Sequence, residues 1–125
     1  MIVTIDLPFP PSLNGNWKAG GGGIYASPRY KAWKEEAYWE IRRQKPAKID
    51  GRFEAEMVFA RPDERKRDLD NLAKPVLDAL KAANVIEDDS LASRLTLAWG
   101  HVQGPTKGAR ISLWPFDGVT DYNRG

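Results

Sequence analysis

Residues 53–83 read FEAEMVFARPDERKRDLDNLAKPVLDALKAA, and the apolar period changes partway through this segment. From Phe53 to Phe59 every second side chain is apolar, which predicts a half-buried strand. From Asn71 to about Ala83 the apolar residues recur at helical spacing, which predicts an amphipathic helix. Pro75 falls near the end of the first turn of this helix, where few or no backbone hydrogen bonds are lost. A strand followed by a helix with one apolar stripe predicts a sheet with helices on one face.

The flanking sequence adds a helix and three strands to this pair. The expected elements are a strand at 1–7, a loop at 12–23, a helix from Ser27-Pro28 to Pro46, strands near 95–99 and 110–114, and a polar, loose tail at 117–125. The order is therefore β-α-β-α-β-β. We expect a single α+β domain, residues 1–125, with a mixed four-stranded sheet and its helices packed on one face.

Composition bounds the possible functions. The chain has 125 residues, an apolar content of 42%, a formal net charge of +2 and no cysteine, which excludes a disulfide, a thiolate nucleophile and a thiolate zinc site. No apolar run approaches the roughly 18 residues that span a bilayer. The N-terminus lacks the charged start and long apolar stretch of a signal peptide. We therefore expect a cytoplasmic protein with no membrane partner.

Acidic residues gather on both sides of the second helix. Asp68 and Asp70 precede it, and Asp88 and Asp89 follow it. In an extended chain, residues two apart point to the same side, so Asp68 and Asp70 could converge on one ion. Oxygen-only ligands favour a hard cation such as Mg²⁺ or Mn²⁺. In the alternative interpretation, one of the first two aspartates caps the helix and Asp88-Asp89 forms a turn.

Cationic residues accompany this acidic cluster. Lys74 lies opposite the apolar stripe of its helix, so it faces away from the core. Beside a metal it could hold a phosphate or stabilise a departing oxygen, but an ordinary helix-surface ion pair is an equal alternative. Arg65, Lys66 and Arg67 lead into the acidic cluster and are candidates for DNA phosphate contacts, the alternative being a solvated turn.

Together these residues resemble the core motif of the RusA-type Holliday junction resolvases. The matching segments are 66–72, Lys74, 78–80 and 86–89, with further similarity at 7–14 and at 106–108. The resemblance implies a dimeric, Mg²⁺-dependent endonuclease that nicks four-way DNA junctions symmetrically during recombination and repair. The metal-binding aspartates of the family fall on Asp68, Asp70 and Asp89, with Asp88 as the neighbouring candidate, and its essential lysine falls on Lys74.

The resulting hypothesis is metal-assisted phosphodiester hydrolysis. Asp68, Asp70 and Asp89 would hold one or two ions and Lys74 would stabilise the phosphate, while Arg65, Lys66, Arg67 and Lys107 would contact backbone phosphates. A homodimer suits a two-fold junction, and Leu77, off the main stripe of its helix, is a candidate interface residue. The resemblance also implies a bacterial protein, possibly prophage- or phage-encoded. Two alternatives are a non-catalytic junction-binding protein and a metal-dependent nuclease acting on other branched DNA.

Overall fold

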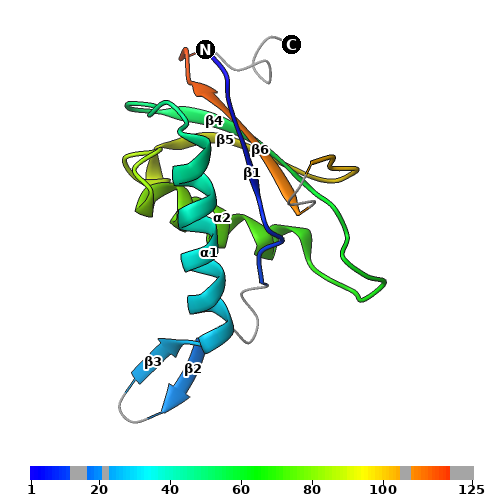
Figure 1. Ribbon diagram of the computed structural model, residues 1–125. Helices are drawn as coiled ribbons and strands as arrows, with labels where there is room; N and C mark the ends of the chain where they lie inside the picture. The colour runs from blue at the N-terminus through cyan, green and yellow to red at the C-terminus, as the bar shows by residue number, and fades with distance from the viewer. Residues whose placement is uncertain (12–16, 21–22, 105–107, 119–125) are drawn as a thin grey trace.

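The computed structural model describes residues 1–11, 17–20, 23–104 and 108–118, without the side chains of 17–20 and 23–26 (Figure 1). Its main sheet has the order β1-β6-β4-β5, formed by β1 (Val3–Leu7), β6 (Ala109–Pro115), β4 (Phe53–Phe59) and β5 (Ala92–Trp99). The β1–β6 and β6–β4 pairs are antiparallel, while β4 and β5 are parallel. The predicted mixed four-stranded sheet is confirmed.

The parallel pair explains the place of the second helix. Two neighbouring parallel strands need a crossover connection, and here it is α2 (Ala73–Ala82), which follows β4 and precedes β5. A 3₁₀ turn, η1 (Leu69–Leu72), leads into α2, and another, η2 (Asp89–Leu91), leads out of the crossover into β5. The acidic residues predicted for the site therefore sit at the two ends of this crossover.

The first helix begins and ends as its sequence predicts. In α1 (Pro28–Gln44), the Ser27 hydroxyl caps the N-terminus by accepting from the Tyr30 N–H at 3.2 Å. The helix ends at Lys45, whose backbone is left-handed with a φ of 51°. Its buried residues are those of the predicted stripe: Tyr30, Trp33, Ala37 and Ile41. These side chains pack with residues of the sheet and of α2 in one core, and only one face of the sheet is buried.

The second helix is more deeply buried than its stripe predicts. It begins at Ala73, two residues later than expected, because the 3₁₀ turn precedes it. Leu77 is only 6% exposed and belongs to the core, so the prediction that it lies in a dimer interface is wrong. The physical reason is that α2 packs against α1 as well as the sheet, which widens its buried arc beyond one stripe.

The predicted loop at 12–23 is also partly wrong. Strands β2 (Trp17–Gly20) and β3 (Gly23–Ala26) pair antiparallel as a separate two-stranded ladder near the start of α1, away from the main sheet (Figure 1). Gly20 pairs with Gly23, so two residues connect the strands, the commonest hairpin length. The rest of the predicted loop, residues 12–16 and 21–22, and most of the predicted loose tail, 119–125, lie outside the described residues. None of the described helices combines the length and apolarity needed to cross a membrane.

Candidate active site

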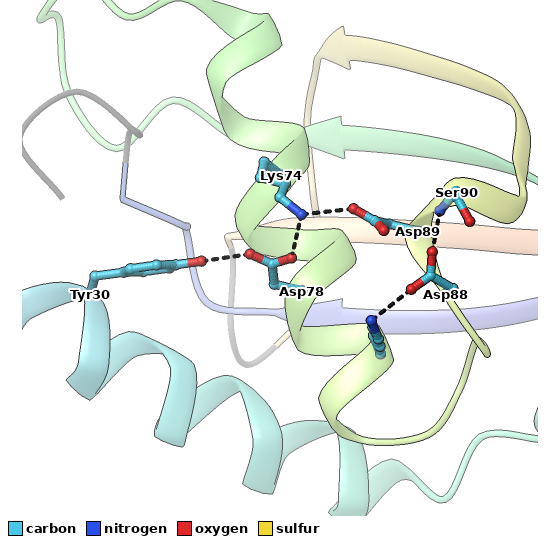
Figure 2. Close-up of polar contacts among 7 residues, drawn as sticks. Tyr30, Lys74, Asp78, Asp88, Asp89 and Ser90 are labelled. Atoms are coloured by element: carbon cyan, nitrogen blue, oxygen red, sulfur yellow. Dashed lines mark hydrogen bonds and ion pairs between the residues drawn. The ribbon is translucent and has the colours of Figure 1, made fainter. Parts of the chain in front are cut away.

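Lys74 stands between two carboxylates on the exposed side of α2. Its Nζ donates to Asp78 Oδ1 at 2.8 Å and to Asp89 Oδ2 at 2.7 Å (Figure 2). Asp78 is one helical turn further along α2, and Asp89 comes from η2, where the chain returns after the helix. The side chain of Lys74 is 49% exposed, so the prediction that it faces away from the core is confirmed. The structure thus joins two of the sequence-predicted site residues, Lys74 and Asp89, directly.

The charge state of Lys74 limits its chemical role. Hydrogen bonds to the Asp78 carboxylate, and then to that of Asp89, raise the pKa of Lys74 above its ordinary value. The side chain is therefore a permanent cation at neutral pH and has no lone pair with which to take a proton. A fixed positive charge of this kind can bind phosphate oxygens or stabilise developing negative charge.

Asp88 and Asp89 are neighbours with different contacts. Both oxygens of Asp88 are in use, since Oδ1 accepts from Lys81 Nζ at 2.6 Å and Oδ2 accepts from the Ser90 N–H at 2.9 Å (Figure 2). The second bond caps η2, as the turn interpretation predicts. The bonds from Lys81 and Ser90 lower the pKa of Asp88. Asp89 instead directs a carboxylate oxygen towards Lys74, which favours it over Asp88 as the third site aspartate.

The capping alternative does not hold for Asp68 or Asp70. Asp68 occupies the N-cap position of η1, but its carboxylate accepts no capping hydrogen bond, and its one described contact is Asn71 Nδ2 at 3.4 Å. Asp70 lies within η1 and is exposed. The residue before α2 is Leu72, so neither aspartate caps that helix. The two carboxylates are exposed at the entrance to α2, where no cation of the described residues is paired with them.

A metal-binding arrangement is only partly visible. Asp68 is extended but Asp70 lies in a 3₁₀ turn, so the extended geometry expected for the pair does not apply. Within the described residues, no three acidic, histidine or cysteine side chains are gathered closely enough to hold a metal ion. The donor chemistry nevertheless fits a hard cation, because every candidate ligand is a carboxylate and two of them have no described cationic partner. The structure brings Asp89 to Lys74 and leaves Asp68 and Asp70 on the adjoining turn.

The basic segment between β4 and η1 is held by its own ion pair. Arg67 binds Asp63 through both arms of its guanidinium, with Nη1–Oδ1 at 2.6 Å and Nη2–Oδ2 at 3.1 Å, and its side chain is only 15% exposed. This contact lowers the pKa of Asp63. Arg65 is 81% exposed and Lys66 is exposed as well. Arg65 and Lys66 are thus exposed to solvent, while Arg67 is held in its ion pair with Asp63 and stabilises the conformation of the segment.

Two aromatic rings support this segment, and sequence reading missed them. The Phe9 and Trp99 rings are stacked with centroids 6.2 Å apart and planes 9° apart. The Arg61 guanidinium lies 4.1 Å from the Trp99 centroid, and that of Arg67 lies 5.4 Å from the Phe9 centroid. Both ends of the basic segment therefore rest on one ring pair by cation–π contact. No local pattern signals this, because the two rings are 90 positions apart in the chain.

A second missed feature is the buried partner of Asp78. The Tyr30 hydroxyl, from α1, donates to Asp78 Oδ2 at 3.0 Å (Figure 2). Lys74 and Asp78 are four residues apart on one helix, a spacing that allows an ion pair, but nothing in the sequence links either residue to another helix. The predicted phosphate contact Lys107 lies outside the described residues.

Comparison with known proteins gives one consistent result. The family model described as endodeoxyribonuclease RusA matches residues 8–113. The chain is 37% identical over 111 residues to the crossover junction endodeoxyribonuclease RusA of Aquifex aeolicus, covering 88% of this chain and 86% of the relative. It is 33% identical over 111 residues to the phage HK97 protein of the same name, covering 85% and 90%. Identity to the Escherichia coli K12 protein is 35% over 118 residues, covering 88% and 90%.

Proposed function

The chain belongs to the RusA family of endodeoxyribonucleases, and we propose that it cleaves four-way DNA junctions. The observation that carries this proposal is the likeness to relatives named crossover junction endodeoxyribonucleases over nearly the full length of both chains. The contacts of Lys74 agree with it, since a fixed cation beside partly exposed carboxylates suits attack on a phosphodiester. Branched DNA is then the substrate, and the bacterial and phage relatives suggest a cytoplasmic role in recombination and repair.

Asp68, Asp70 and Asp89 are the residues proposed to hold Mg²⁺, or Mn²⁺ in its place. When bound, such an ion supplies Lewis-acid charge and an activated water. Asp89 approaches Lys74 from η2, and Asp68 and Asp70 lie on the turn that runs directly into the helix bearing Lys74. Lys74 would offer its ammonium to an oxygen of the scissile phosphate and would stabilise the negative charge that develops there.

Arg65, Lys66 and Lys107 are proposed to meet DNA phosphates, which fix the position of the duplex without reading its sequence, and Arg67, the fourth candidate, is proposed to support them. The exposure of Arg65 and Lys66 suits direct contact, whereas Arg67 would act by holding the segment in shape. We further propose a homodimer that makes paired symmetric nicks, since a two-fold protein presents two sites to two like strands of a junction.

A synthetic four-way junction tests the proposal. We expect Mg²⁺-dependent paired nicks in the junction and none in a linear duplex of the same sequence. Asp70→Asn should abolish nicking and keep junction binding in Ca²⁺, while Asp50→Asn, the same chemical change at an exposed residue whose ion pair is with Lys48, should nick normally. Binding without nicks in Mg²⁺ or Mn²⁺ would instead indicate a non-catalytic junction protein. Equal nicking of flaps and junctions would indicate a broader nuclease of branched DNA.

A further inference from the structure

Lys74 shares one of its two carboxylates with the proposed metal site. Asp89 accepts from Lys74, and it is also a proposed metal ligand. A divalent cation bound to Asp89 would compete with the ammonium for this carboxylate, because both are positively charged. Asp78 has no such second role, so it is the partner that can hold Lys74 in place throughout the reaction. This inference rests on the proposed function, since it concerns the lysine of that site.

The carboxylate of Asp78 is fixed at both oxygens. Its Oδ1 accepts from Lys74 and its Oδ2 accepts from the Tyr30 hydroxyl at 3.0 Å (Figure 2). Because each oxygen has its own donor, rotation of the carboxylate would break at least one hydrogen bond. A lysine side chain has several free rotations, whereas this carboxylate gives its ammonium a defined position.

Tyr30 ties this arrangement to the core. Its side chain is fully buried, its backbone N–H is held by the Ser27 cap, and its ring stacks on Trp33 at 6.5 Å. Trp33 is held in turn by a hydrogen bond from its Nε1 to the Pro8 carbonyl at 3.1 Å. Burial, and then the charge of Asp78, raise the pKa of Tyr30, so its hydroxyl stays protonated and remains a donor. The hydroxyl thus occupies a place that core packing determines.

We propose that Tyr30 and Asp78 are positioning residues: the buried Tyr30 hydroxyl of α1 orients the Asp78 carboxylate, which holds the Lys74 ammonium at the scissile phosphate. The contacts run from a residue with no exposure, through a partly exposed carboxylate, to a half-exposed cation. Neither residue touches the substrate in this arrangement. Their contribution is the fixed position of the charge on Lys74.

Tyr30→Phe is the sharpest variant because it removes one hydroxyl and leaves the buried ring. We expect kcat for junction nicking to fall about tenfold, with KM within about twofold, since Lys74 remains charged but is less well placed. Asp78→Asn should lower kcat further, by about 10- to 100-fold, because Lys74 loses the charged partner that it does not share with the proposed metal site. Tyr38→Phe is the matched control on the same helix, since the Tyr38 hydroxyl makes no hydrogen bond to any residue that the structure describes, and it should leave kcat unchanged.

A spectroscopic measurement separates positioning from general destabilisation. The ¹⁵N NMR signal of the Lys74 ammonium, assigned by its loss in Lys74→Ala, should shift or broaden in metal-free Tyr30→Phe. The signal of Lys81, which pairs with Asp88 at 2.6 Å and has no link to Tyr30, should not change. An unchanged Lys74 signal, or equal changes at Lys74 and Lys81, would overturn the proposal.

The two proposals fail in different ways. If the wild-type protein leaves junction DNA intact, the proposed function fails, yet the ammonium signals still decide whether Tyr30 positions Lys74. If the wild type nicks junctions and Tyr30→Phe nicks them at the same kcat, the positioning role fails and the proposed function stands. A fall in kcat with a selective change at Lys74 supports both.

Discussion

Two ion-pair networks can be compared, one that contains Lys74 and Asp89 of the proposed site and one in the basic segment that precedes it, and they are anchored differently. The network of α2 and η2 ends on the buried hydroxyl of Tyr30, while that of the basic segment 61–67 contacts the partly buried rings of Phe9 and Trp99 through cation–π interactions. Exposed ion pairs contribute little to folding, typically about 0–1 kcal/mol. Their value therefore lies in what they position. The first network places one charge in a defined position, whereas the second shapes a segment of chain.

The contrast between neighbouring aspartates gives the largest expected effect. Asp89→Asn should reduce junction nicking about 1,000-fold or more, because it weakens a proposed metal ligand and a partner of Lys74 together. Asp88→Asn should keep nicking within a few fold, since asparagine still caps a turn well. Single-turnover nicking rates measure both. If Asp88→Asn proved the more damaging change, the third metal ligand would be Asp88.

The next largest effect on the nicking rate is expected from a comparison of two lysines on α2, Lys74 and Lys81. Lys74→Ala should lower the nicking rate by about 100- to 1,000-fold, the usual cost of removing one group that stabilises transition-state charge. Lys81→Ala removes an equally exposed lysine whose partner is Asp88, and it should nick at nearly the wild-type rate. Junction binding in Ca²⁺ should change little in either variant. Wild-type nicking by Lys74→Ala would return this lysine to the surface ion pair that helix spacing alone suggests.

Much of the fold was accessible from sequence because its signals are local. The strand at 53–59 has a clear period of two, and Ser27-Pro28 combines a cap with a preferred first residue. The ladder of β2 and β3 was missed because each strand is only four residues long and contains glycine, so a period of two is hard to recognise there. Leu77 was misplaced because the width of a buried arc depends on how many elements pack around the helix.

The candidate site likewise contains some residues that the sequence reveals and others that only the structure reveals. Lys74 and Asp78 are linked by helix spacing. The acidic pattern pointed to Asp68, Asp70, Asp88 and Asp89, and the resemblance to a known family selected Asp68, Asp70 and Asp89 among them. Tyr30 could not be found, because its contact with Asp78 depends on how α1 packs against α2. The different contacts of Asp88 and Asp89 also could not be found from sequence, because two adjacent carboxylates are equivalent there until one is seen to cap a turn.

The aromatic support of the basic segment predicts a smaller effect, on binding and not on chemistry. Trp99→Leu removes the ring beneath Arg61 and the stacking partner of Phe9 while keeping an apolar side chain. Cation–π contacts at exposed sites contribute about 0.5–1 kcal/mol, so junction affinity in Ca²⁺ should fall about two- to fivefold. The nicking rate at saturating enzyme should be unchanged. A loss of nicking at full binding would show that the ring pair also supports the Lys74 network.

The smallest expected effect is the loss, in acid, of the stability that the Arg67–Asp63 ion pair contributes to the basic segment. The hydrogen bond from Arg67 lowers the pKa of Asp63 below its unfolded value of about 3.9, so the ion pair contributes stability above that pH and loses it as the pH falls through the folded pKa. The difference in melting temperature between wild type and Asp63→Asn should therefore be constant from about pH 8 to pH 5 and shrink below about pH 4. Asp50→Asn, whose Lys48 contact is 3.8 Å long, should show almost no difference at any pH. A difference that persisted unchanged at pH 2 would mean that the variant acts through packing of the segment and not through the ion pair.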